Sequence, residues 1–171
     1  MKQILLFFLG TAILFVQLSC SKKMTAEQYH QHLLELHTFY KNYFEAFSAS
    51  SSTSEELEKW NTDFESRKKS DLKLLKTMKA SGLDDELHTI YEDIITHIEY
   101  SNSHNHREVI IIKKKESKDL EDTSKLNRFY RDTTRYYRSK EELFVEYYFK
   151  FINRHHLNAD HSLLQLREEL F

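Results

Sequence analysis

Proline is absent from this sequence, and glycine is nearly so. None of the 171 residues is proline, and the two glycines are Gly10 and Gly82. Turns between β-strands usually need these residues, because glycine tolerates positive φ and proline presets φ. Long helices joined by a few polar turns need neither. We therefore expect an all-α fold. The charged fraction of 30% and the apolar fraction of 40% indicate a globular chain.

The sequence also lacks cysteine pairs, an excess of positive charge and the common catalytic motifs. Its single cysteine, Cys20, excludes an internal disulfide, cysteine-cluster zinc sites and covalent c-type haem. The net charge of -2 gives no reason to expect a nucleic-acid partner, which would need a strongly basic face. There is no nucleophile elbow, glycine-rich phosphate loop or H-E-x-x-H motif. We therefore expect no enzymatic activity.

An apolar run of 13 residues, from Ile4 to Val16, opens the chain after the positively charged Lys2. A helix that spans a bilayer needs about 20 such residues, so this run is too short to remain as a membrane anchor. It has the length of the hydrophobic region of a signal peptide. The sequence therefore predicts that residues 1–19 are a signal peptide.

The only cysteine follows closely after that run. Leu18-Ser19-Cys20 resembles the lipobox of bacterial lipoproteins, in which a small residue precedes the cysteine that receives diacylglycerol. The sequence departs from the usual lipobox at Gln17, where an aliphatic residue is commoner. The resemblance implies acylation of Cys20 and anchoring to a lipid bilayer of the cell envelope, at the outer membrane or periplasmic face rather than in the cytoplasm. The alternative is an ordinary secretory signal that releases a free protein.

The rest of the chain divides into a short tether and one domain. Residues 20–24 would form the lipidated tether, whose Lys22 and Lys23 suit anionic headgroups. Each acyl methylene buried in the bilayer contributes about 0.8 kcal/mol, and two or more chains give stable anchoring. Residues 25–171 would form the helical domain.

Capping motifs and helical periodicity predict the first two helices. Thr25 with Gln28 forms a capping box that places the first helix start near residue 25. The second helix starts near Thr53 and ends at Gly82, which tolerates the left-handed conformation. Charged residues interrupt its apolar face at Arg67, Lys68 and Asp71. We therefore expect the middle of the second helix to be its least buried part.

Two further helical segments follow, with one point left open. The third begins near Leu83, passes through the polar residues 101–106 and resumes an apolar run at residues 109–112. This segment could be one long helix with a polar patch, or two helices with a kink between them. The apolar run could also be a short strand, but we favour a helix. The fourth covers residues 120–155, and its aromatic column consists of Tyr130, Tyr137, Phe144 and Phe151.

A short fifth helix over about residues 159–170 completes the expected fold. Together the segments predict an antiparallel up-down-up-down helical bundle of four long helices plus a short C-terminal helix. In such a bundle the fourth helix, at ~1.5 Å per residue, extends beyond the first two.

Ten histidines are the one feature of the composition that invites a site. His30 and His37 on the first helix, and His97 and His104 on the third, could face one another in a bundle that binds metal or haem. Glu27-x-x-His30 is a single instance of the motif that di-iron bundles repeat. The simpler interpretation is that these histidines flank an aromatic core.

Three more histidines surround a predicted turn, and a lysine run precedes the fourth helix. His155, His156 and His161 could bind zinc or copper, or could cap helices and face solvent. Lys113-Lys114-Lys115 is either a solvated helix end or a contact for an anionic partner or membrane. We expect neither a metal nor a cofactor at these residues.

The sequence therefore predicts a membrane-anchored envelope lipoprotein that acts as a non-enzymatic binding or structural module. Its partners would be the lipid bilayer, through acylated Cys20, and an unidentified protein. The alternative is a periplasmic helical bundle that binds metal or haem through its histidines.

Overall fold

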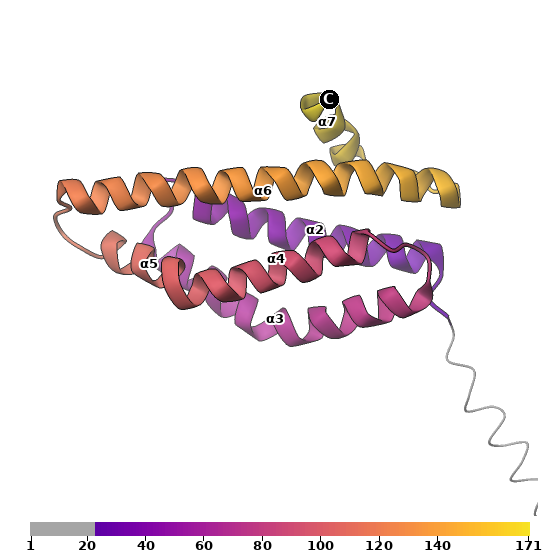
Figure 1. Cartoon of the computed structure of the whole chain (residues 1–171), viewed down its shortest axis with the longest axis horizontal. Coiled ribbons are helices and arrows are strands. Elements are labelled where there is room, and N and C mark those ends of the chain that lie inside the picture. Colours follow the sequence, from indigo (N-terminus) through magenta and orange to yellow (C-terminus); the bar gives the residue numbers. More distant parts are fainter. Residues whose placement is uncertain (1–22) are drawn as a thin grey trace, which may run out of the picture.

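A computed structural model of the chain describes residues 23–171, which are largely helical and contain no strand (Figure 1). The prediction of an all-α fold is confirmed for these residues. The predicted signal peptide and Cys20 lie outside them. The helices are α2 (Ala26–Ser48), α3 (Ser54–Ser81), α4 (Leu87–Ser101), the π-helix η1 (Asn102–His106), α5 (Arg107–Lys113), α6 (Leu120–His155) and α7 (His161–Leu170). None of these described helices combines the length and the apolarity that crossing a bilayer requires.

The predicted capping residues fix the ends of the first two helices. The Thr25 hydroxyl accepts a hydrogen bond from the Gln28 amide at 3.2 Å, and the Gln28 side chain accepts one from the Thr25 amide at 3.0 Å. Thr53 begins α3 with the same arrangement. Gly82 ends α3 with a φ of 68°, a left-handed conformation that favours glycine. These boundaries agree with the sequence prediction because each rests on local hydrogen bonding.

The third predicted helix starts later than expected. Leu83 lies in the turn before α4, and the Asp84 carboxylate accepts hydrogen bonds from the Glu86 and Leu87 amides at 2.9 and 2.8 Å. The polar residues that follow α4 are wound as the π-helix η1, and α5 continues directly from it. The sequence left open one long helix with a polar patch or two helices with a kink. The helical segment is uninterrupted, and its polar patch is the π-helical turn. The apolar residues 109–112 are helical, as favoured.

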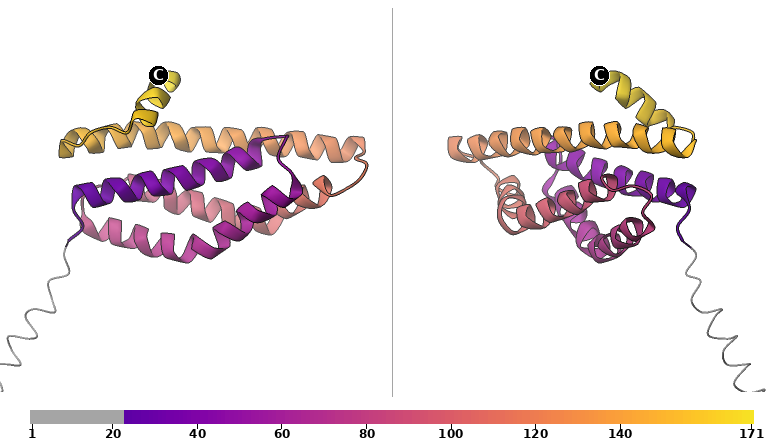
Figure 2. Two further views of the ribbon diagram at one scale, coloured as in Figure 1. Left: turned by 180° about the vertical axis from the view of Figure 1, so that it is seen from behind. Right: turned by 45° about the vertical axis from the view of Figure 1, so that its right-hand side comes forward.

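The long helices lie side by side (Figures 1 and 2), with α2 packed against α3 and α6, and α4 packed against α3 and α6. We call the end that holds the start of α2, the α3–α4 turn and the end of α6 the entry end, because the described chain begins there. We call the opposite end, with the α2–α3 loop, η1, α5 and the start of α6, the far end. The start of α6 reaches past α2 at the far end. α7 packs against α6, and its Leu166, Glu169 and Leu170 line a pocket together with residues of α2 and α6.

The aromatic column of α6 is buried unevenly. Phe144 is 1% exposed and Phe151 is fully buried, whereas Tyr130 and Tyr137 are only partly buried. Phe144 stacks on His37 of α2 with ring centroids 4.4 Å apart, and Phe151 lies 4.9 Å from Tyr29. Burial along this column therefore increases from Tyr130 to Phe144.

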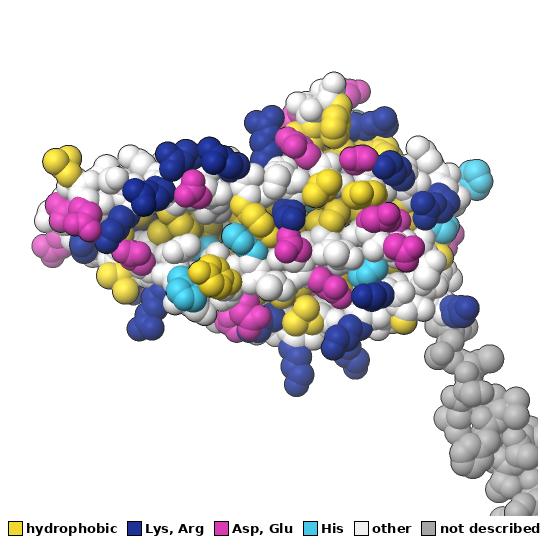
Figure 3. Space-filling model, in the orientation of Figure 1, with side chains coloured by type: hydrophobic (Ala, Val, Ile, Leu, Met, Phe, Trp, Pro, Cys, Tyr) yellow, Lys and Arg dark blue, Asp and Glu magenta, His cyan; other side chains and the backbone are white. Residues whose placement is uncertain are grey.

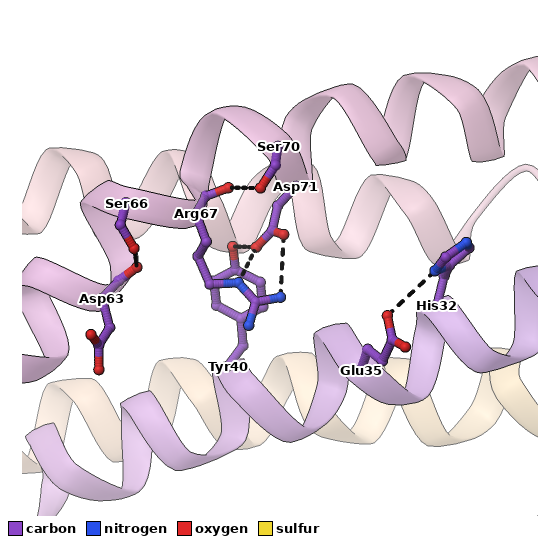
Figure 4. A network of polar contacts seen from close by, with 8 residues as sticks. All are labelled: His32, Glu35, Tyr40, Asp63, Ser66, Arg67, Ser70 and Asp71. Carbon is purple, nitrogen blue, oxygen red and sulfur yellow. Dashed lines mark hydrogen bonds and ion pairs between the residues drawn. The ribbon is translucent and has the colours of Figure 1, made fainter.

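The middle of α3 is not its least buried part, so this expectation from the sequence is wrong (Figure 4). Asp71 is 5% exposed, and Arg67 donates to its two carboxylate oxygens at 2.7 and 3.2 Å. The Tyr40 hydroxyl of α2 donates to the same carboxylate at 2.9 Å. The Arg67 guanidinium also lies 4.0 Å from the centroid of the Phe39 ring. A charge can be buried where a charged partner and hydrogen bonds offset its desolvation.

Candidate binding site

Two histidines of α2 contact aromatic rings of α6. His37 is 8% exposed, and burial lowers its pKa to about 4. His30 Nε2 lies 2.8 Å from the Tyr148 hydroxyl. That hydroxyl accepts a hydrogen bond from the Asp160 amide at 2.9 Å, so its proton is directed toward His30. Glu27 is exposed and takes no part in this contact.

The histidines of the third segment lie elsewhere. His97 stacks on Tyr136 of α6 with centroids 3.6 Å apart, and burial lowers the pKa of His97. His104 is exposed, stacks on Tyr100 and places its Nδ1 2.9 Å from the Tyr100 carbonyl oxygen. The two predicted pairs therefore do not meet each other, because His30, His37 and His97 all face rings of α6.

The turn histidines occupy structural positions at the entry end. His156 adopts the left-handed conformation with φ 55° at the end of α6, and His155 Nε2 lies 3.3 Å from the Leu83 carbonyl oxygen. His161 is exposed at the start of α7, where Asp160 provides the cap. Within residues 23–171, no group of three or more His, Cys, Asp or Glu side chains is arranged to hold a metal ion.

The structure adds a histidine that the sequence analysis did not single out. His106 of η1 is 2% exposed, and its ring stacks on Phe47 with centroids 4.2 Å apart. Its Nδ1 lies 2.6 Å from Asn102 Oδ1 and 2.9 Å from the Tyr43 hydroxyl. Tyr43 also lies 2.8 Å from Asn61 Oδ1. This geometry fits a neutral His106 whose Nδ1–H donates to Asn102, while Tyr43 donates to Asn61.

Burial strongly favours the neutral form of His106 and lowers its pKa to about 3. In the sequence this histidine stands in a wholly polar run, where regular helical spacing does not identify it as buried. The π-helix inserts one extra residue into the turn, which changes the register on which such a prediction depends. In the sequence, the only sign of this buried histidine was a polar run between two apolar helical segments.

A cavity of about 310 Å³ lies beside η1, between the third segment and α6. The apolar part of its lining consists of Val109, Ile112 and Phe129. The polar part consists of His97, Ser101, Asn105, Glu108, Lys125, Arg128, Asp132 and Thr133. Its size lies at the lower limit of pockets that bind small molecules. π-helical turns frequently occur at functional sites, so this cavity is the main candidate site in the described part of the chain.

Charged groups of both signs surround the cavity. Lys125 lies 3.0 Å from Glu108 and 3.1 Å from Glu121, and these carboxylates raise its pKa to about 12. Asp132 is paired with Arg131 at 3.3 Å. Arg128 forms no ion pair within residues 23–171, so it is available to an anionic group.

The lysine run after α5 has internal partners at the far end. Lys113 donates to the Ser50 carbonyl at 3.0 Å and also to that of Ser52. Lys114 lies 2.7 Å from Glu58, and Lys115 lies 2.6 Å from Asp122. These contacts join the end of α5 to the α2–α3 loop, to α3 and to the start of α6, so the run has a structural role in the fold.

No family model matches this chain, and no curated protein or solved structure matches it significantly.

Proposed function

We propose that the protein is an envelope lipoprotein, anchored through acylated Cys20, whose helical domain binds a partner and catalyses no reaction. The observation that supports this most strongly is the position of the only cysteine, just after a 13-residue apolar run and directly after Leu18-Ser19. Two or more acyl chains on one cysteine would hold the protein stably at a bilayer.

We infer that the long helices form an antiparallel up-down-up-down bundle to which α7 is added. The connections at residues 49–53, 82–86 and 114–119 are short, as such bundles require. Tyr29, near the start of α2, contacts Phe151, near the end of α6. Lys113, at the end of α5, contacts Ser50 after the end of α2. Both contacts fit helices that run in alternating directions.

The far end supports a binding role over a purely structural one. The tether of residues 20–24 would attach the domain at its entry end, so the cavity beside η1 would face away from the bilayer. Metal or haem binding by the histidines has no comparable support, because His30, His37 and His97 each contact an aromatic ring of α6.

Labelling with palmitate in a bacterial host tests the anchor. The wild-type chain should incorporate the label and Cys20→Ser should not, because the thiol is the acyl acceptor. Ser21→Ala is the matched control and should incorporate as much label as the wild type. Equal labelling of the wild type and Cys20→Ser, or no labelling of either, would contradict the proposal.

A further inference from the structure

The outer face of α6, which points away from α2, differs between its two halves. α7 packs against part of the C-terminal half, where Leu163 is buried and the Arg167 guanidinium lies 4.5 Å from the centroid of the Phe149 ring. No helix in the described part of the chain covers the N-terminal half (Figure 1). One half of this face therefore already packs against a helix, and the other half is free to do so.

Four arginines line the uncovered half. Arg128, Arg131, Arg135 and Arg138 are exposed, and their spacing of three, four and three residues places them on one side of α6. We call them the arginine stripe. They are half of the eight arginines of the chain. Residues 123–139 carry five cationic side chains and one carboxylate, a net charge of +4 in a chain whose total is -2. Figure 3 shows cationic side chains gathered over this part of α6.

The arginine stripe has few partners of its own. Arg128 and Arg135 form no ion pair with any described residue. Arg131 and Arg138 pair with Asp132 and Glu142 at 3.3 Å, but these side chains are 46–66% exposed, and exposed pairs contribute little to stability. By contrast, the lysines 114, 115 and 125 at the same end each lie within 3.0 Å of a carboxylate. The stripe is therefore a surplus of positive charge with no evident role in the fold.

The chemistry of arginine favours a protein partner. A guanidinium binds a carboxylate through two parallel hydrogen bonds, which an ammonium cannot do. Arginine is enriched at protein interfaces, whereas lysine is depleted. A second basic row, Lys69, Lys73, Lys76 and Lys79 on α3, is also exposed and has similar spacing. We call it the lysine stripe, and it offers the same charge without the planar guanidinium groups.

We propose that the arginine stripe is a docking surface for an acidic helical segment of a partner protein, which lies along α6. Successive arginines are separated by roughly 4.5–6 Å along the helix axis, the spacing of carboxylates at the same positions of a partner helix. Leu120 is 91% exposed on the same side of α6 and would give this partner an apolar contact. The orientation of the arginine stripe relative to the membrane rests on the proposed anchoring. This anchoring places the stripe toward the far end and away from lipid headgroups.

A synthetic helical peptide tests this surface directly. It carries four glutamates at the same three-four-three spacing on an alanine and glutamine background. Fluorescence anisotropy measures its binding to the full mature protein in uncharged detergent micelles. Replacing all four stripe arginines by glutamine should weaken binding by about tenfold or more, because desolvated charge pairs are lost. Replacing the four lysines of the lysine stripe by glutamine removes as much charge and should change binding by less than about twofold.

Several results would overturn the proposal. Equal losses in the two variants would mean that only net charge matters. Full affinity after replacement of the four arginines by lysine would show that the guanidinium geometry is not used. Equal binding of a peptide with shifted glutamate spacing would exclude a helical partner. Stripe-dependent binding to anionic vesicles without binding to the peptide would assign the surface to lipid. Circular dichroism of each variant verifies folding, and palmitate labelling tests the anchor independently of all these results.

Discussion

The two ends of the domain differ in how they use aromatic and polar side chains. At the entry end, Tyr29, Tyr148 and Phe151 are fully buried and contact one another or their neighbours across α2 and α6. At the far end, Phe129 and Tyr130 are only partly buried, and a cavity of about 310 Å³ opens beside η1. Buried apolar area supplies most of the stability of a domain, whereas sites of recognition tend to lie in its less stable parts. Much of the far end is also well packed, since Phe47 is fully buried and His106 is 2% exposed. The loosely packed region is confined to the start of α6 and the cavity beside η1, and this is the part left free for binding.

The buried polar groups differ between the middle of the domain and its far end. The carboxylate of Asp71 in the middle of α3 is neutralised by Arg67 and hydrogen-bonded by Tyr40. At the far end, His106 and Tyr43 form a network of neutral groups. Neutral hydrogen bonds are weaker than charge-assisted ones, so the polar contacts at the far end are the weaker of the two sets.

Truncating a core aromatic residue of α6 and one at the far end should give the largest difference. Phe144→Ala should lower the free energy of unfolding by about 3–5 kcal/mol, because transfer energy is lost and a cavity remains. Tyr130→Ala should cost only about 1–2 kcal/mol, since Tyr130 is partly exposed and its main charged contact is Lys113, 5.4 Å from the ring centroid. Urea melts of both variants measure these losses.

Phe144→Leu provides the control, because it retains most of the buried volume and should cost less than Phe144→Ala. If Tyr130→Ala were as destabilising as Phe144→Ala, the far end would be as important to stability as the core. The proposed division of roles would then be wrong.

Acid should destabilise the domain through its two most buried histidines with lowered pKa. Burial lowers the pKa of His106 to about 3 and that of His37 to about 4, below the ordinary value of 6.5. The unfolded chain therefore binds protons that the folded chain does not, and stability falls as pH decreases from 6.5 toward 4. Each histidine should contribute about 1.4 kcal/mol per pH unit to this slope.

Urea melts between pH 4 and 7 measure the slope. His106→Gln and His37→Gln should each make it shallower by about that amount, whatever their effect on stability at neutral pH. His104→Gln, at an exposed position of η1, controls for the loss of a histidine. An unchanged slope in His106→Gln would mean that this ring is protonated in the folded domain.

The sequence predicted those features of the fold that depend on local signals. The boundaries of α6, the capping threonines and Gly82 were predictable because each depends on neighbouring residues. The middle of α3, where Arg67 pairs with Asp71, was wrongly expected to be the least buried part of the helix. The sequence shows where charged residues lie but not whether they pair. η1 was not predictable, because an extra residue in one turn leaves no fixed pattern in the sequence.

The candidate sites were less predictable than the fold. The spacing of the arginine stripe is visible in the sequence. Whether these arginines form an uncovered surface depends on where α7 packs on α6, which the sequence does not show. The cavity beside η1 is lined by residues of α4, η1, α5 and α6, which only the tertiary packing of these helices brings together. The predicted lipidation of Cys20 lies outside the described residues and is still a prediction.

The central claim is that the anchored protein holds its far end away from the bilayer. Fluorescence energy transfer to an acceptor on the lipid headgroups tests it in vesicles, because the native Cys20 would be acylated and an introduced cysteine would carry the only donor. A donor at Ala80→Cys, near the α3–α4 turn, should transfer energy efficiently. A donor at Ser124→Cys, in α6 at the far end, should transfer much less, because it lies roughly 45 Å along α6 from the entry end. Equal transfer from both positions, or greater transfer from position 124, would contradict the account.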